Sequence, residues 1–185
     1  MRYACKTVTN NKKVCLVNEE RKVTKEDLYH LLDGGNGFAA FPRITSEDNK
    51  IGVLSTAAFE AVYGSAEAEK AINIIYFFLS EKPVPRLLGE SRILYIGQTR
   101  TSFKARYLPH AEIQATSKAN SLKFGTIIEK YGPISIACCD YREFGDSLLG
   151  AEGQFLWWYF QNHCEYPPLN YTKTKIRNDA VMLRG

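Results

Sequence analysis

The stretch that decides the fold is residues 72–79, which read Ile-Asn-Ile-Ile-Tyr-Phe-Phe-Leu. Its β-branched and aromatic side chains are almost uninterrupted by polar ones, which is typical of a strand buried on both faces. A second run, Arg-Ile-Leu-Tyr-Ile-Gly, spans residues 92–97, and residues 81–91 between the two runs contain prolines and a glycine. We therefore predict an antiparallel pair of strands joined by a long loop over residues 81–91.

The flanking residues predict helices and one more strand. Residues 56–71 are rich in Ala and Glu and predict one helix that tolerates Gly64, and residues 121–131 carry apolar side chains at helical spacing. In chain order the elements expected after the strand pair are a basic helix from about residue 102, kinked at Pro109, then a helix over 121–131, a strand over 134–139 and an apolar helix over 146–162. This order predicts an α+β fold, in which helices cover a small three-stranded antiparallel sheet.

Composition excludes several classes of protein. The chain has 185 residues, of which 45% are hydrophobic and 24% charged, and these values favour one globular domain or a small domain with an appendage. No run approaches the ~18 apolar residues of a membrane helix, and the first residues lack the apolar core of a signal peptide. Five cysteines, two of them adjacent, argue against a disulfide framework. We therefore expect a cytoplasmic protein without a membrane partner.

Charge is uneven along the chain. Residues 1–25 hold seven basic and two acidic side chains (+5), residues 26–90 hold five and ten (−5), and residues 98–131 hold six and two (+4). Basic segments of this kind are candidate contacts for a phosphate backbone, although an ordinary solvated surface gives the same pattern. The candidate nucleic-acid-binding residues are Arg100, Lys104, Lys118 and Lys123.

Glu152 is the most informative single residue. On a helix its neighbours Leu148, Phe155 and Leu156 form an apolar stripe, so that this carboxylate is expected to face the core. A buried carboxylate must be paired, hydrogen-bonded or bound to a metal, because an isolated buried charge is costly. The pattern alone leaves open a structural salt bridge and a functional role.

Several polar residues around this helix stand in a recognisable order. They are Tyr76, the run Tyr95-Ile96-Gly97-Gln98-Thr99, Arg106 and His110 four apart, Glu152, and the run Pro168-Leu169-Asn170. In this order and spacing the chain resembles the GIY-YIG nuclease family over roughly residues 72–172. The first half of the motif reads Ile-Ile-Tyr without the glycine of the family, and nineteen positions separate Tyr76 from Tyr95, which implies an inserted loop.

The resemblance implies a metal-dependent endonuclease, a hydrolase that cuts the phosphodiester bonds of DNA. In it Glu152 would hold one Mg²⁺ or Mn²⁺, Arg106 would grip the scissile phosphate, and Tyr76 would be the general base. Tyr95 and His110 would help to position the water, and Asn170 would orient the site. Because a free tyrosine has a pKa near ~10, the general base requires cations to lower that pKa, and Arg106, the metal and Lys104 are the candidates.

The resemblance also divides the chain. Residues 71–172 would form the catalytic domain, residues 1–70 an accessory region for target recognition or dimerisation, and residues 173–185 a basic tail. The accessory region is expected to contain a β-hairpin over residues 3–17 and a short helix over 25–32. A homodimer is one expected state, and restriction, phage, defence and repair roles all stay open.

Two other functions remain alternatives. One is a binding module for nucleic acid that has this fold and no activity, and the other is an RNA-directed nuclease. The pair Tyr76 and Tyr95 also has a plain interpretation, since two tyrosines on adjacent strands commonly just pack against each other.

Overall fold

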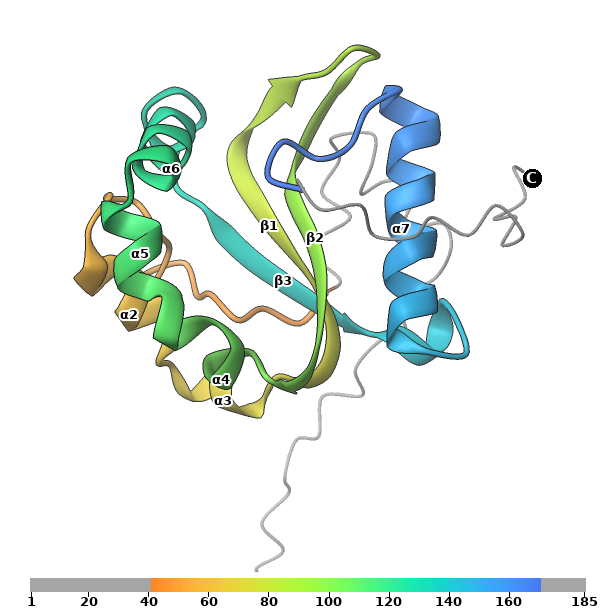
Figure 1. Cartoon of the computed structure of the whole chain (residues 1–185), viewed down its shortest axis with the longest axis horizontal. Coiled ribbons are helices and arrows are strands. Elements are labelled where there is room, and N and C mark those ends of the chain that lie inside the picture. The colour runs from red at the N-terminus through yellow and green to blue at the C-terminus, as the bar shows by residue number, and fades with distance from the viewer. Residues whose placement is uncertain (1–40, 171–185) are drawn as a thin grey trace, which may run out of the picture.

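The fold is built on a three-stranded antiparallel sheet (Figure 1). The structure is a computed structural model that describes residues 41–170. Strands β1 (Ile72–Pro85), β2 (Glu90–Ser102) and β3 (Ser135–Asp140) lie in the order β2-β1-β3, so that the most apolar strand is central. The predicted α+β class and three-stranded antiparallel sheet are confirmed.

The predicted loop over residues 81–91 is wrong in extent. Both strands continue into it and leave only residues 86–89 as a turn, which is closed by a bond from Arg86 N to Gly89 O at 3.0 Å. The ladder is irregular between Leu79 and Val84, and in that interval the Ser80 hydroxyl donates to the carbonyls of Lys82 and Arg92. Pro83 lies within this irregular interval and Pro85 is the last residue of β1, so neither proline interrupts a regular run of ladder bonds.

Helices cover both faces of the sheet (Figure 1). One face carries α2 (Thr56–Tyr63), α3 (Ala66–Lys70), α4 (Phe103–Tyr107), α5 (Ala111–Thr116) and α6 (Lys118–Tyr131), and the other carries α7 (Leu148–His163). Two short 3₁₀ turns, η2 (Leu108–His110) and η3 (Tyr141–Glu143), link α4 to α5 and follow β3.

Two predicted helix boundaries are wrong. The single helix expected over residues 56–71 is two helices, because Gly64 ends α2 and the Ser65 hydroxyl accepts from Ala68 N to begin α3. Helix α6 begins at Lys118 instead of Ser121, whose hydroxyl donates to the carbonyl of Ser117 within the helix. Ser121 therefore lies inside the first turn and Ser117 is the N-cap residue, so the sequence pattern placed the start one turn too late.

The sheet separates two hydrophobic cores. Side chains of β1 point alternately to the two faces of the sheet. Ile74, Tyr76 and Phe78 pack in the core under α2–α6, and Ile75, Phe77 and Leu79 pack in the core under α7. This alternation, with both faces buried, is the physical reason for the continuous apolar run in the sequence.

Residues 41–70 pack against the same sheet. Arg43 and Ile51 form antiparallel bridges with Ala137 and Ile134, and Phe59 and other side chains of α2 lie in the core under α2–α6. The division at residue 70 stays a prediction. The expected hairpin over 3–17, the helix over 25–32 and the tail at 173–185 lie outside the described residues. Across residues 41–170 no helix combines the length and the apolar character that crossing a membrane requires.

Candidate active site

Tyr76 lies at the centre of a cluster of tyrosines. It stands on β1 opposite Gly97 of β2, and its ring stacks on that of Tyr95 with centroids 6.0 Å apart and planes 20° from parallel. Its hydroxyl is hydrogen-bonded to the hydroxyl of Tyr107 at 2.8 Å. Tyr76 is 1% exposed and Tyr95 is half-buried, so the cluster runs from the core to the surface.

Sequence reasoning missed Tyr107. Its ring stacks on Phe103, the first residue of α4, at 4.5 Å, and meets the Tyr76 ring edge-on at 5.4 Å. Phe103, Tyr107, Ala111 and Ala115 recur every four residues and are all buried. In the sequence this spacing indicates only a core-facing helix side, and nothing in it marks the hydroxyl as a partner of Tyr76.

Gly97 is required by the close approach of the two rings. A Cβ atom built on Gly97 would lie 2.5 Å from Cε1 of Tyr95 and 2.6 Å from the hydroxyl oxygen of Tyr76. Contacts this short are repulsive, so that any side chain here would push the tyrosines apart. The glycine of the Tyr-Ile-Gly run therefore shapes the site through the space that it leaves.

Arg106 and Glu152 come to this cluster from opposite layers. Arg106 is exposed on α4, and Glu152 is 8% exposed on the first turns of α7. Burial raises the pKa of Glu152 to about 7, while the Arg106 guanidinium acts to lower that pKa. Within residues 41–170 the Glu152 carboxylate makes no hydrogen bond or salt bridge. It is thus a desolvated carboxylate with unused acceptor oxygens.

Both of these charges affect the pKa values of Tyr76 and Tyr95. Burial raises the pKa of Tyr95, and the Glu152 carboxylate raises it further, whereas nearby hydroxyls and Arg106 act in the opposite direction. Tyr76 has the same pattern, with burial as the largest effect. Arg106 and Glu152 thus both act on the pKa values of Tyr76 and Tyr95, and a shared catalytic role for the four residues stays a prediction.

Burial and Arg106 act on the pKa of Tyr76 in opposite directions. Arg106 does lower the pKa of Tyr76, but burial outweighs it and the net pKa lies well above the ordinary value of 10.0. Lys104 is not among the groups that affect Tyr76, because its ammonium pairs with Glu69 at 3.1 Å. In the protein without metal or substrate, the Tyr76 hydroxyl is therefore protonated.

Asn170 holds the chain after α7 against β2. Its carboxamide oxygen accepts from Ile96 N at 3.0 Å and its amino group donates to Ile96 O at 2.8 Å. Leu169 N also donates to Leu94 O at 2.9 Å. Because Ile96 lies between Tyr95 and Gly97, these bonds fix the strand that carries both.

His110 lies apart from these contacts. It is exposed, at the end of η2 just before α5, and the described residues give it no hydrogen bond or ion pair with the tyrosines. Pro109 lies within η2, which turns the chain between Arg106 and His110 more tightly than a continuous α-helix. The role of His110 stays a prediction.

The candidate phosphate-binding residues occupy two places. Arg100 is exposed near the end of β2 and Lys104 lies on α4, whereas Lys118 begins α6 and Lys123 is half-buried on the same helix. The first pair precedes Arg106 in the sequence, and the second pair lies on α6.

No family model, curated protein or solved structure matches this chain.

The residues present fit a hard cation that keeps most of its own water. Residues 41–170 contain no group of three or more His, Cys, Asp or Glu side chains placed to hold a metal, which does not suit a site with all-protein ligands such as structural zinc. Mg²⁺ is commonly bound by one or two carboxylates, with waters and phosphate oxygens completing its shell. The unbonded Glu152 carboxylate is suited to this role.

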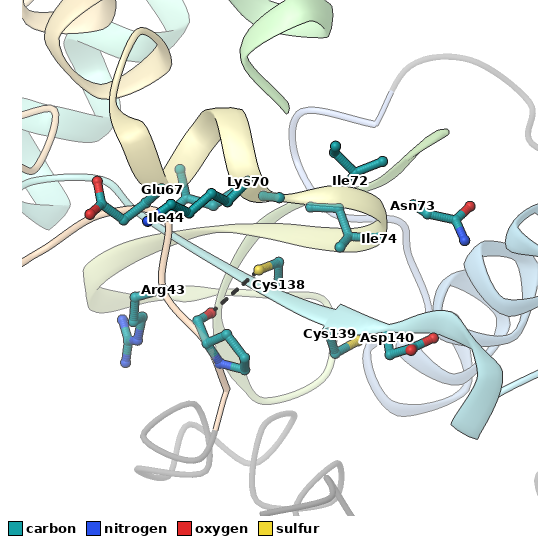
Figure 2. Close-up of a pocket in the computed structure, with 12 residues that line it drawn as sticks. Arg43, Ile44, Glu67, Lys70, Ile72, Asn73, Ile74, Cys138, Cys139 and Asp140 are labelled. Atoms are coloured by element: carbon teal, nitrogen blue, oxygen red, sulfur yellow. Dashed lines mark hydrogen bonds between the residues drawn. The ribbon is translucent and has the colours of Figure 1, made fainter. Parts of the chain in front are cut away.

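A cavity of about 360 Å³ lies at a different place, where β1 begins and β3 ends (Figure 2). Its lining includes Lys70, Asn73 and Asp140, and the thiol of Cys138 points to the carbonyl of Pro42 at 3.6 Å. Basic and acidic side chains both line it, and it shares no residue with the tyrosine cluster. This cavity is therefore not part of the candidate active site.

Proposed function

We propose that the chain is a metal-dependent endonuclease of the GIY-YIG type that hydrolyses phosphodiester bonds in DNA. The observation that carries the proposal is the buried Glu152 carboxylate, which makes no bond within residues 41–170 and lies in electrostatic reach of Arg106 and two tyrosines. A purely structural carboxylate is expected to have its charge paired or its oxygens hydrogen-bonded. Unused oxygens beside an exposed arginine are the arrangement that a metal and a phosphate require.

Arg106 is suited to hold the scissile phosphate. Its guanidinium is exposed and makes no ion pair within the described part of the chain. The planar fork of arginine matches two phosphate oxygens at once and keeps its charge at any working pH. It would therefore stabilise the negative charge that grows on the phosphoryl oxygens in the transition state.

Glu152 would hold one Mg²⁺ or Mn²⁺ beside that phosphate. The bound cation supplies positive charge to the leaving oxygen. Ionisation of the carboxyl must come first, and the raised pKa of about 7 places this ionisation near neutral pH. Metal affinity is therefore expected to rise with pH through neutrality, because the cation competes with a proton for the same oxygens.

The tyrosines would hold the attacking water and a phosphate oxygen. Tyr76 and Tyr95 present two hydroxyls on one stack of rings, and Tyr107 fixes the direction of the Tyr76 hydroxyl through a 2.8 Å bond. As the proposed general base, Tyr76 would first lose its own hydroxyl proton to solvent, and the resulting phenolate would then accept the proton of the attacking water. The raised pKa of Tyr76 weighs against this step in the substrate-free protein, so the pH dependence of the rate is its test.

The activity is tested by incubating the full chain with plasmid DNA, duplex oligonucleotides and RNA, in Mg²⁺, in Mn²⁺ and in EDTA. We expect cleavage of DNA that requires the metal and that Arg106→Ala abolishes, while the matched variant Arg142→Ala, at an exposed arginine paired with Asp140 at 3.1 Å, cuts normally. Binding without cutting in either metal would establish the alternative binding module. Cleavage confined to RNA would establish the RNA-directed alternative.

A homodimer is proposed for cuts in both strands, since one site of this kind hydrolyses one strand at a time. Analytical ultracentrifugation with and without a duplex tests it. A monomer on every duplex that is cut in both strands would remove the dimer and leave sequential nicking.

A further inference from the structure

A second cavity opens directly beside the tyrosine cluster. It has a volume of about 170 Å³ and lies between the sheet and the helices α5 and α6. Tyr95 and Tyr107 form one wall and thus belong both to the cavity and to the candidate active site. Leu169 closes another side, in the segment that Asn170 fixes to β2.

Four of the seven residues that line the cavity are aromatic. Phe78 lies between Tyr95 and Tyr107, with ring centroids 5.7 Å and 5.5 Å away, and Phe124 of α6 adds a fourth ring. No charged side chain lines the cavity. A phosphate or a carboxylate would lose its hydration here without gaining a counter-charge, whereas a neutral flat ring would gain stacking contacts.

Two carboxamides stand at the cavity with unused hydrogen-bonding groups. The Gln114 oxygen accepts from the Tyr63 hydroxyl, which leaves the amino group of Gln114 without a bond among residues 41–170. The Asn120 amino group donates to Ile113 O at 3.3 Å, which leaves its oxygen without a bond in the same part of the chain. One donor and one acceptor are thus available, and the edge of a nucleobase carries donors and acceptors of both kinds.

We propose that this cavity takes up a single nucleobase, turned out of the stack next to the scissile phosphate. The proposal rests on the proposed nuclease function and adds to it a site that selects where the strand is cut. The cavity accommodates one planar ring system and no sugar or phosphate, which stay outside it. Proteins that recognise single bases commonly stack them on aromatic side chains and read their edges by hydrogen bonds.

The position of the cavity gives the base a role in cleavage. Its shared wall, Tyr95 and Tyr107, contacts Tyr76, so a base seated here would bring the adjoining sugar-phosphate to the hydroxyls and Arg106. Extrusion costs the pairing and stacking of that base, and this cost is lowest at mismatched, damaged or single-stranded positions. We therefore expect preferential cutting at sites where one base is already unpaired.

The test uses duplexes that span a cut site mapped in the cleavage assay, bound in EDTA so that none is consumed. Each base near the cut is replaced in turn by an abasic residue, and so is each base opposite. At one position close to the cut, loss of the base is expected to weaken binding about 10- to 100-fold. Loss of the opposite base at that position is expected to strengthen binding several-fold, because the inserted base no longer has to be unpaired.

A matched pair of variants links the effect to the cavity. Asn120→Leu keeps the approximate size of the side chain and removes its acceptor, and Asn162→Leu makes the same change on α7, where the Asn162 amino group bonds Trp158 O at 2.8 Å. Asn120→Leu is expected to reduce the position-specific effect at least five-fold, and Asn162→Leu to leave it unchanged. Urea unfolding of both variants identifies any loss of folding.

The outcomes are separable. If the wild type binds and cuts DNA but abasic residues change its binding equally at every position, the nucleobase site is overturned and the nuclease function stands. The same conclusion follows if folded Asn120→Leu shows the same position-specific effect as the wild type. Absence of both binding and cutting would overturn the proposed function and this inference together.

Discussion

Replacing Glu152 with Gln removes its charge and keeps its size. Burial raises the pKa of Glu152 from 4.5 to about 7, so the folded protein holds this proton more tightly than the unfolded chain. Stability of the metal-free protein therefore falls as pH rises from about 4.5 to 7, and above pH 7 the full cost of the buried charge is present. Glu152→Gln does not carry this cost.

The magnitude follows from the pKa difference. Each unit of difference between the folded and unfolded pKa corresponds to about 1.4 kcal/mol, so ionised Glu152 costs at most about 3.5 kcal/mol, and partial solvation of the carboxylate brings this nearer to about 2 kcal/mol. At about 2–4 °C per kcal/mol for a chain of this size, Glu152→Gln is expected to melt about 4–8 °C above the wild type at pH 8 in EDTA. At pH 4 the two proteins should melt together.

The assay is thermal or urea unfolding at intervals from pH 4 to pH 8.5, with Glu129→Gln as the control at an exposed carboxylate of α6. Added Mg²⁺ is expected to stabilise the wild type at pH 8, by about 1.4 kcal/mol at ten times its dissociation constant, and to leave Glu152→Gln unchanged. If the stabilities of the wild type and Glu152→Gln change with pH in the same way, the Glu152 carboxyl is not desolvated. Equal stabilisation by Mg²⁺ would refute a metal at Glu152.

Gly97→Ala places a Cβ atom 2.6 Å from the Tyr76 hydroxyl oxygen. We expect the free energy of unfolding in urea to fall by about 1–3 kcal/mol and cleavage to be abolished, whereas normal activity would show that the two rings can move apart freely. Tyr107→Phe removes the 2.8 Å bond to Tyr76, lowers stability by about 0.5–1.5 kcal/mol and further raises the pKa of Tyr76. Because a general base must be deprotonated to act, the ascending limb of the pH–rate profile is expected to move to higher pH, and an unmoved ascending limb contradicts proton transfer to Tyr76. Asn170→Ala removes both bonds to the Ile96 backbone and is expected to accelerate amide hydrogen exchange at Ile96 and to slow cleavage, and unchanged exchange would show that the segment is held by other contacts.

The sequence predicts the parts of the fold that depend on hydrophobic patterning. The apolar run from Ile74 to Leu79 indicates a central strand because both of its faces are buried, and the structure has it between β2 and β3. The apolar stripe around Glu152 likewise predicts its burial, and the exposed fraction is 8%. Each of these predictions needs only the period of the element and the cost of burying polar groups.

What the sequence could not give depends on contacts between distant residues. Strand β1 passes through Pro83 because the ladder is irregular between Leu79 and Val84, and no local pattern indicates this irregularity. The bond between Tyr76 and Tyr107 joins residues 31 apart, and the requirement for Gly97 comes from two rings that meet above it. The effect of burial on the pKa of Tyr76 has the same origin, since the side chains that bury it come from distant parts of the chain.

Single-turnover cleavage of a mapped DNA site by the wild type and by Glu152→Gln, in Mg²⁺ at pH 8, tests the central claim most directly. Both proteins are folded under these conditions if the unfolding curves above are as expected, so a difference in rate reports on the site. We predict a loss of about 10²-fold or more in Glu152→Gln, which is the scale of one lost electrostatic contact to a transition state. Cleavage by Glu152→Gln within two-fold of the wild-type rate would contradict the claim.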